Sequence, residues 1–235
     1  MIFEMEREIY CSMIGGDGRI RNSAIIDLLQ DASDLHLKNH PVLADFFREE
    51  DCVMFLVSRQ VDILRRPVYG EKVRVKTWTY ELNRMYGFRN TLIYGADGEV
   101  CVQTIAGGAF MDTSSLRPMR VPTELIERVN TFERHDMEYL PRKIAVPKRE
   151  PDAQVQAVIR SCDIDMNRHV NNARYLDIIE ELADGTDAKR LRLEYKVPLK
   201  RDDKAFIKRY DTEDGCITTI EGEDGIRFFT AQTLK

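Results

Sequence analysis

The residues best suited to chemistry in this sequence are four polar side chains spaced two apart: Asp163, Asp165, Asn167 and His169. Alternate residues of an extended backbone point to the same side, so this spacing predicts that all four side chains share one face. Apolar residues then recur at helical spacing as far as Leu182, and Asn172 is a favoured N-cap. The pattern predicts a carboxylate, an amide and an imidazole at the mouth of a helix. The first N–H groups of that helix would stabilise a developing oxyanion.

Other interpretations of the same stretch compete. The acidic spacing imitates the start of a calcium loop, but Arg168 and Arg174 stand where that loop needs Gly and a bidentate Glu. We therefore exclude calcium. Cys162 and His169 could form a nucleophilic pair, although no neighbouring residue in the sequence would activate the thiol. A structural polar turn with a helix cap needs no chemistry at all and stays open at this point.

Composition excludes several classes of function. The 235 residues are 43% hydrophobic and 32% charged, which is enough apolar material for a core, and the net charge of −5 disfavours general nucleic-acid binding. No apolar run has the length of a membrane span, and acidic residues near the N-terminus argue against a signal or transit peptide. The five cysteines show no metal-type clustering and fit reduced thiols. We expect a bacterial cytoplasmic protein without metal; a processed organellar protein is the alternative.

The first part of the chain predicts one helix and several antiparallel strands. A strand over residues 3–14 precedes a helix over 23–38 that Asn22 or Ser23 would cap, and His36 near its end is read as structural. Alternating segments predict strands at 52–64, 72–82, 88–94 and 100–111. Residues 112–152 are rich in proline and charge. They predict a surface linker with one short helix at 122–129 and a solvated His135.

The second part repeats the first at a displacement of 150 positions. Ile20 then falls on Val170 and Leu29 on Ile179, and later strands are expected at 191–200, 205–210, 217–220 and 226–234. The sequence predicts an α+β fold with repeats at 1–112 and 153–235 joined by a linker at 113–152. The two copies differ where the helix begins, because Gly15, Asp17 and Arg19 occupy the positions of Asp165, Asn167 and His169. A purely structural cap should look alike in both copies, so this asymmetry favours a functional site in the second.

The motif Asp165-x-Asn167-x-His169-Val170-Asn171-Asn172-x-x-Tyr175 resembles the active-site signature of the acyl-ACP thioesterases. The similarity extends into the first repeat through Ser58-Arg59-Gln60-Val61, Val75-Lys76-Thr77-Trp78 and Phe88-Arg89-Asn90. The resemblance implies two hotdog domains in tandem, each a long helix wrapped by a curved antiparallel sheet. It also implies hydrolysis of fatty acyl-ACP in fatty acid biosynthesis, without cofactor or metal.

Carried over by position, the resemblance makes Asp165, Asn167 and His169 catalytic and gives Asn171 and Asn172 capping or substrate-positioning roles. The family has a further Glu after a Leu-Glu-Tyr triplet. Here the triplet ends at Tyr195, and Pro198 stands at the Glu position. Either Asp165 acts without a second carboxylate, or Glu194 or Asp163 takes the place of the missing Glu. Strand alternation does not obviously point Glu194 to the side on which the missing Glu would lie.

The sequence leaves alternatives open for both the carrier of the acyl chain and the reaction. An acyl-CoA thioesterase is the nearest rival, and a hotdog dehydratase or a non-catalytic acyl-binding module also fits the predicted fold. The acyl chain length is not determined by the sequence, and a homodimer is one assembly that it allows. An acidic carrier protein would need local basic clusters. One candidate cluster consists of Arg65, Arg66, Lys72, Arg74 and Lys76. The other consists of Lys189, Arg190, Arg192, Lys196, Lys200 and Arg201, and it is preferred because it follows the motif.

Overall fold

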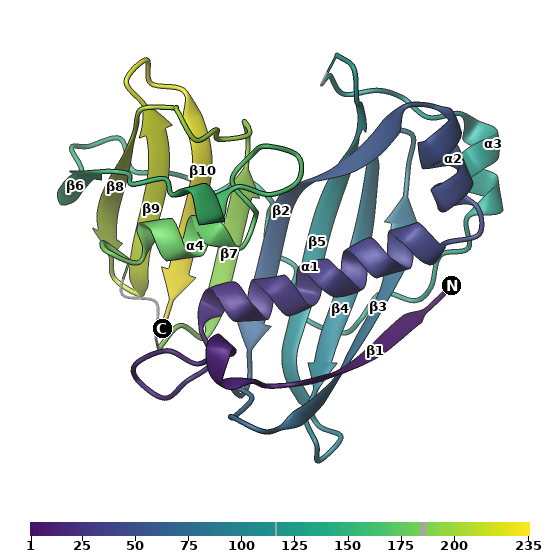
Figure 1. Ribbon diagram of the computed structural model, residues 1–235, viewed down its shortest axis with the longest axis horizontal. Coiled ribbons are helices and arrows are strands. Elements are labelled where there is room, and N and C mark those ends of the chain that lie inside the picture. The colour runs from purple at the N-terminus through teal and green to yellow at the C-terminus, as the bar shows by residue number, and fades with distance from the viewer. Residues whose placement is uncertain (116, 184–186) are drawn as a thin grey trace.

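The computed structural model describes residues 1–115, 117–183 and 187–235. Their strands form one antiparallel sheet of ten, in the order β1-β3-β4-β5-β2-β7-β10-β9-β8-β6 (Figure 1). The strands are β1 Phe3–Glu8, β2 Cys52–Ile63, β3 Lys72–Leu82, β4 Tyr86–Tyr94, β5 Val100–Asp112, β6 Ala153–Gln156, β7 Arg190–Tyr195, β8 Ala205–Thr212, β9 Gly215–Gly222 and β10 Arg227–Leu234. The helices are α1 Asn22–Asn39, α2 Leu43–Glu49, α3 Thr123–Arg128 and α4 Arg174–Ile179, with 3-10 turns η1 Cys11–Met13 and η2 Ser161–Asp163. The class is α+β, as expected.

The strand order reads the same from either edge of the sheet. The first half supplies β1-β3-β4-β5-β2 and the second supplies β6-β8-β9-β10-β7, so each strand has a counterpart across the centre. The halves meet where Ser58–Asp62 of β2 pairs antiparallel with Arg190–Glu194 of β7. Matching turns support the repeat, because Gly98 and Gly225 have φ of 82° and 79° in hairpins closed by the same hydrogen bonds. Such left-handed angles favour glycine.

The two helices that lie on the sheet differ in length. α1 has 18 residues and crosses the sheet of its own half, whereas α4 has six and lies against β7 and β10 (Figure 1). The expectation of a long helix in each half is therefore wrong for the second. After Ile179 the chain turns, since the Leu182 and Ala183 N–H groups both donate to the Ile179 carbonyl. Nη1 of Arg209 donates a hydrogen bond to the Leu182 carbonyl at 2.6 Å.

Most predicted strands lie within a few residues of the observed ones, but other details differ. β7 ends at Tyr195 and not at residue 200, and β1 ends at Glu8 because η1 follows it. Neither α2 nor β6 was predicted, since seven and four residues are too short to show a clear period. Asn22 lies inside α1, whose N-cap is Arg21 with no side-chain capping bond.

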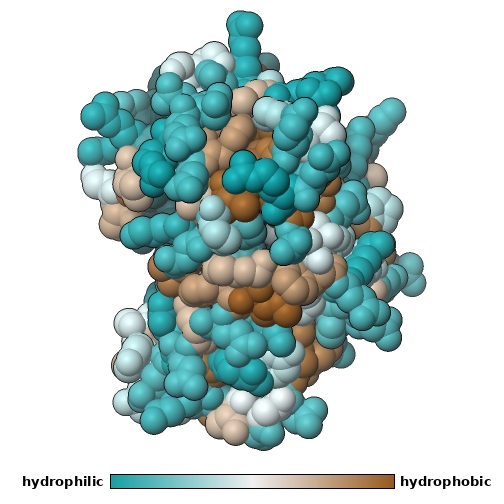
Figure 2. Space-filling view, turned by 90° about the vertical axis from the view of Figure 1, so that its right-hand side faces the viewer, coloured by the Kyte–Doolittle hydropathy of each residue, from teal (hydrophilic) through white to brown (hydrophobic). Residues whose placement is uncertain are grey.

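A large core joins both halves, and a smaller one closes the free end of the first. The large core includes Ile25 and Leu29 of α1, Val61 of β2 and Phe229 of β10. The smaller core surrounds Phe110 and Leu43 at the α2 and α3 end. Figure 2 looks at this end and shows hydrophobic side chains gathered between hydrophilic ones. No helix among the described residues is both long and apolar enough to cross a membrane.

The segment between the halves runs along the face of the sheet that α1 leaves uncovered. Trp78 donates its indole N–H to the Glu133 carbonyl at 2.8 Å, and Gln60 donates to the Glu138 carbonyl at 2.8 Å. His135 was expected to be solvated but is half-buried, with Nε2 3.1 Å from Gln103 Oε1. These bonds attach the segment to the sheet at several points.

Candidate active site

The polar motif forms a tight turn between two short bridging segments. Ile164 and Val170 pair as an antiparallel bridge, the Asp165 N–H donates to the His169 carbonyl at 2.9 Å, and the Arg168 N–H donates to the Asp165 carbonyl at 3.0 Å. We call residues 164–170 the motif turn. The expectation of an extended strand with four side chains on one face is therefore wrong. Asp and Asn side chains can bond nearby backbone and so favour turns over strands.

Asp165 has one carboxylate oxygen held by the turn and one oxygen free of it. Oδ1 accepts the Asn167 N–H at 2.8 Å and the His169 N–H at 3.5 Å. Oδ2 has no hydrogen bond to the described residues, and the residue is half-buried. Fixing one oxygen orients the carboxylate while leaving the other available to accept a proton or attack a carbon.

Asn167 and His169 are joined to this carboxylate through their backbone N–H groups. Asn167 is exposed and His169 half-buried, and neither side chain bonds to another described residue. The turn thus brings the three predicted residues together through the backbone. It does not link their side chains into a preformed relay.

Asn172 is not the N-cap of the helix, which is Ala173 and has no side-chain capping bond. Asn171 Oδ1 accepts the Ala173 N–H at 2.9 Å, which caps the entrance to α4. Asn172, the expected cap, instead donates its amide to Gln30 Oε1 of α1 at 3.3 Å. The N–H groups of Ala173 and Arg174 already bond to Asn171. The expected oxyanion donors at the start of a long helix are therefore occupied.

Tyr175 and Leu199 hold the motif turn against α4. The Val170 N–H donates to the Leu199 carbonyl at 2.8 Å, and the Leu199 N–H donates to Tyr175 Oη at 3.0 Å. Burial, with a smaller contribution from the Asp165 charge, raises the pKa of Tyr175 to about 12. Its ring packs 4.8 Å from that of Phe229. A neutral, buried hydroxyl of this kind acts as a structural support.

Neither carboxylate proposed as a substitute for the missing Glu faces Asp165. The Asp163 side chain is fully buried and accepts the Arg160 N–H at 2.7 Å and Nη2 at 2.9 Å. Glu194 alternates with the core residue Leu193, so it lies on the opposite face of β7, where it accepts the Ile144 N–H at 3.4 Å. Both groups already serve other contacts.

A thiol–imidazole pair is also absent from the described contacts. Cys162 is exposed, and its Sγ lies 3.9 Å from Asp163 Oδ1 with no contact to His169. No group of three His, Cys, Asp or Glu residues in the described part of the chain is arranged to hold a metal ion.

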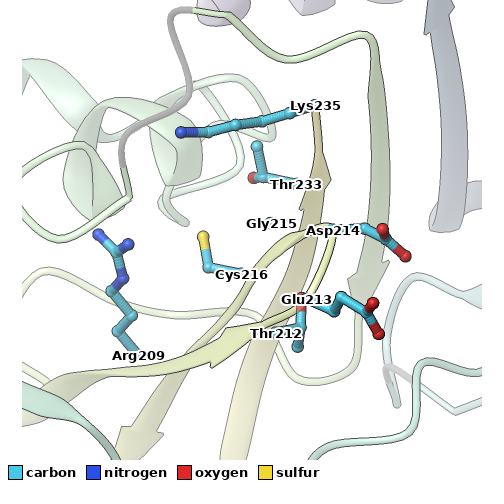
Figure 3. A pocket seen from close by; sticks show the side chains of 8 residues that line it. All are labelled: Arg209, Thr212, Glu213, Asp214, Gly215, Cys216, Thr233 and Lys235. Carbon is cyan, nitrogen blue, oxygen red and sulfur yellow. The ribbon is translucent and has the colours of Figure 1, made fainter.

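Two cavities of similar size lie away from the motif. One of about 370 Å³ opens at the β8–β9 hairpin, where Figure 3 shows Arg209, Cys216 and Lys235 around it. The other, of about 380 Å³, lies between the sheet and residues 134–142 and is lined by Tyr80, Phe88 and several arginines. Asp165, Asn167 and His169 line neither cavity.

Residues of the first half near the motif were not predicted as part of the site. Gln30 bonds to Asn172, and Asp34 lies one turn further along α1. Arg59 and Arg89 are buried beneath this helix. A signal was present in the sequence, since Arg59 shares the inward alternation of Val61 and Ile63, where a charged residue is unusual.

Family models match most of the chain. The N-terminal domain model of the acyl-ACP thioesterases matches residues 1–129, and the C-terminal domain model of the same family matches residues 148–225. Among curated proteins, the oleoyl-acyl carrier protein thioesterase 2 of Arabidopsis thaliana is 24% identical over 227 residues. That match covers 86% of this chain but 61% of the longer plant protein.

Solved structures share the fold. An acyl-ACP thioesterase from Bacteroides thetaiotaomicron superposes with a TM-score of 0.86 at 18% identity, covering 99% of this chain and 97% of the other. The 12:0-ACP thioesterase from Umbellularia californica gives a TM-score of 0.82 at 20% identity, with 99% and 96% covered. These similarities extend over both halves and show that the whole chain adopts this fold.

Proposed function

We propose that this chain, which belongs to the acyl-ACP thioesterase family, hydrolyses the thioester between a fatty acyl chain and acyl carrier protein. The observation that carries the proposal is Asp165, whose carboxylate is fixed at one oxygen and free at the other beside His169. We assign residues 1–112 and 153–235 to two hotdog repeats joined by 113–152. We place the reaction in fatty acid biosynthesis in a bacterial cytoplasm.

Asp165 supplies the base or the nucleophile. As general base, its free oxygen takes a proton from water while the water oxygen bonds to the acyl carbon; as nucleophile, it attacks that carbon and forms an anhydride that water then opens. Asn167 orients the attacking group. The carbon–sulfur bond breaks, and His169 gives a proton to the departing sulfur. The products are a fatty acid and the free thiol of the carrier.

The oxyanion needs a donor that the turn has not already used. The N–H groups of residues 169, 170, 171, 173 and 174 all have acceptors within the protein. The Asn172 N–H has no acceptor in the described part of the chain, so it is the donor that we assign to the carbonyl oxygen. A single such donor typically contributes about 10²–10³-fold in rate.

The carrier protein is proposed to bind beside the motif turn. The first basic cluster is largely neutralised, since Arg65 pairs with Glu71, and Arg74 and Lys76 both pair with Glu4. In the second cluster Arg190 pairs with Asp62. The cations of that cluster without an ion pair among the described residues include Lys200 and Arg201.

Lys200 and Arg201 adjoin the motif turn through the bond between Val170 and Leu199. Met166 at the tip of the turn is 94% exposed, and Val197 is 43% exposed. We define the carrier face as Met166, Arg168, Val197, Lys200 and Arg201. Apolar groups bordered by cations complement an acidic partner with apolar contacts of its own.

Charge reversal tests this face. The double variant Lys200→Glu/Arg201→Glu should raise KM for acyl-ACP and reduce its salt dependence, while hydrolysis of a short acyl-pantetheine stays unchanged. The matched control Lys38→Glu/Lys72→Glu reverses two exposed charges elsewhere and should change neither. Equal effects of both double variants would disprove the assignment.

The reaction itself is tested with a panel of thioesters. The protein is incubated with acyl-ACP, acyl-CoA and β-hydroxyacyl-ACP, and the products are identified by mass spectrometry. Free fatty acid from acyl-ACP at a higher kcat/KM than from acyl-CoA supports the proposal. Faster release from acyl-CoA would make the chain an acyl-CoA thioesterase. An enoyl product would identify a dehydratase, and binding without turnover would indicate an acyl-binding module.

A further inference from the structure

Hydrogen bonds connect the motif to a carboxylate in the other half of the chain. Asn172 donates its amide to Gln30 Oε1 at 3.3 Å, and Gln30 donates its own amide to Asp34 Oδ1 at 2.9 Å. Gln30 and Asp34 are four residues apart on α1 and therefore lie on the same helix face. The two bonds bring α1 of the first half into contact with the residues that follow the motif turn.

Two buried arginines lie beneath Asp34. Arg59 comes from β2 and Arg89 from β4, and they are 3% and 7% exposed. Arg89 donates to the Ser33 carbonyl at 3.3 Å, whereas Nε and Nη1 of Arg59 have no partner in the described residues. Neither forms an ion pair there with a carboxylate. Buried cations without a direct counter-ion favour a nearby anion.

Asp34 and Asp165 are the anions of this region. Asp34 is exposed on α1, yet the protein around its carboxyl group displaces enough water to raise the pKa of Asp34; the Gln30 hydrogen bond and the charges of Arg89 and Arg59 lower it, and the charge of Asp165 raises it. The carboxylates of the two halves are therefore close enough to influence each other. Asp31, the neighbouring acid on α1, is influenced instead by the charges of Arg7, Asp27 and Asp34.

We propose that Asp34 is a positioning residue of the hydrolytic site, contributed by the first half. The inference rests on the proposed function. Through Gln30 it orients Asn172, whose N–H is assigned to the oxyanion. Its carboxylate also lies within electrostatic range of Asp165. Since Asp163 and Glu194 serve other contacts, Asp34 is the second carboxylate of the site.

Two substitutions separate the charge from the hydrogen bond. Asp34→Asn removes the charge but keeps an acceptor for Gln30, so it should retain most of the wild-type kcat. Asp34→Leu also removes the acceptor, and kcat should fall about tenfold with little change in KM. Asp31→Asn is the matched control on the same helix and should leave both unchanged.

A second readout needs no activity. The carboxyl group of Asp34 can be followed by ¹³C NMR during a pH titration, and Asp165→Asn should lower its midpoint. An unchanged midpoint would overturn the inference, even in a protein that hydrolyses none of the thioesters. A wild-type kcat in Asp34→Leu, or an equal fall in kcat in Asp31→Asn, would also overturn it. The proposed function fails separately, if the wild-type protein releases no fatty acid.

Discussion

The motif turn and residues 14–20 of the first half have the same backbone and different chemistry. In both, a 3-10 turn leads into an antiparallel bridge, Ile14 with Ile20 and Ile164 with Val170. The Gly15 N–H donates to the Arg19 carbonyl at 2.8 Å, as the Asp165 N–H donates to that of His169 at 2.9 Å. The first turn forms with Gly15, Asp17 and Arg19 at the three positions, and the Arg19 N–H donates to Asp17 Oδ1 at 3.0 Å. The backbone of the turn therefore does not need the combination of Asp, Asn and His. Their presence in the second copy needs a reason other than folding, and the proposed chemistry provides one.

One further difference concerns strain. Gly18 has φ of 77° and Arg168, at the same place in the second turn, has φ of 62°. Glycine adopts such angles freely, whereas other residues adopt them at a cost of roughly 1 kcal/mol or more. The second turn thus keeps a strained arginine where the first shows that glycine suffices. The proposed carrier face would give this side chain a function.

The largest expected effect comes from neutralising the acid in one turn but not the acid in the other. Asp165→Asn should lower kcat about 10²–10⁴-fold with little change in melting temperature, because a general base or nucleophile is lost and the turn can keep its hydrogen bonds. Asp17→Asn, in the first turn, should keep wild-type kcat. Steady-state kinetics with acyl-ACP and thermal unfolding check both. Equal losses in the two variants would refute a single site in the second half.

Lowering the pH should destabilise the fold, because His36 and His40 in the first half are buried as neutral side chains. Burial lowers the pKa of His36 to about 3 and that of His40 to about 4, while His169 is only half-buried. The unfolded chain then binds more protons below pH 6.5, so stability falls as the pH drops from there towards 4. For His36 alone the loss between pH 7 and pH 5 should be about 2 kcal/mol. Urea unfolding at both pH values measures it, and His36→Gln should reduce the difference.

Substitutions at the left-handed position of the two turns should change the free energy of unfolding in opposite directions. Arg168→Gly relieves the left-handed backbone and should raise the free energy of unfolding by about 1 kcal/mol, and Gly18→Arg should lower it by a similar amount. Arg168→Gly should also raise KM for acyl-ACP a few-fold while sparing acyl-pantetheine. Denaturant unfolding and kinetics test the pair. A more stable variant with unchanged KM would remove Arg168 from the carrier face.

The smallest effect is expected at Glu194. It lies on the face of β7 away from the motif and contacts Ile144 and Lys196, so Glu194→Gln should retain most of the activity. The family pattern raised it as a substitute carboxylate. A fall in kcat to the level of Asp165→Asn would show that it has been recruited.

Much of the fold could be predicted from local patterns. β3 was predicted at its observed bounds because alternation over Lys72–Leu82 is regular, and the repeat was visible at a constant displacement. Short elements such as α2 and β6 carry too few residues for a period. Leu182, just after α4, accepts a hydrogen bond from Arg209, a residue distant in sequence, and no local pattern reveals such a contact.

The site was predicted less completely than the fold. The sequence identified Asp165, Asn167 and His169, but it assigned them an extended backbone because alternation alone cannot separate a strand from a turn closed by Asx bonds. The contact between Asn172 and Gln30 spans 142 positions, so spacing within the motif could not show it. Asp34 of α1, together with Arg59 and Arg89 buried beneath that helix, became a candidate only once the folded chain showed these residues close together.

The central claim is that the motif turn, and not its counterpart, delivers water to an acyl thioester. The most direct measurement is a reaction with acyl-ACP in H₂¹⁸O, with the released fatty acid analysed by mass spectrometry for wild type, Asp17→Asn and Asp165→Asn. We predict ¹⁸O in the carboxyl group and free carrier thiol from the first two proteins, and intact acyl-ACP with the third. Labelled fatty acid from Asp165→Asn at the wild-type rate, or loss of release in Asp17→Asn alone, would contradict the account.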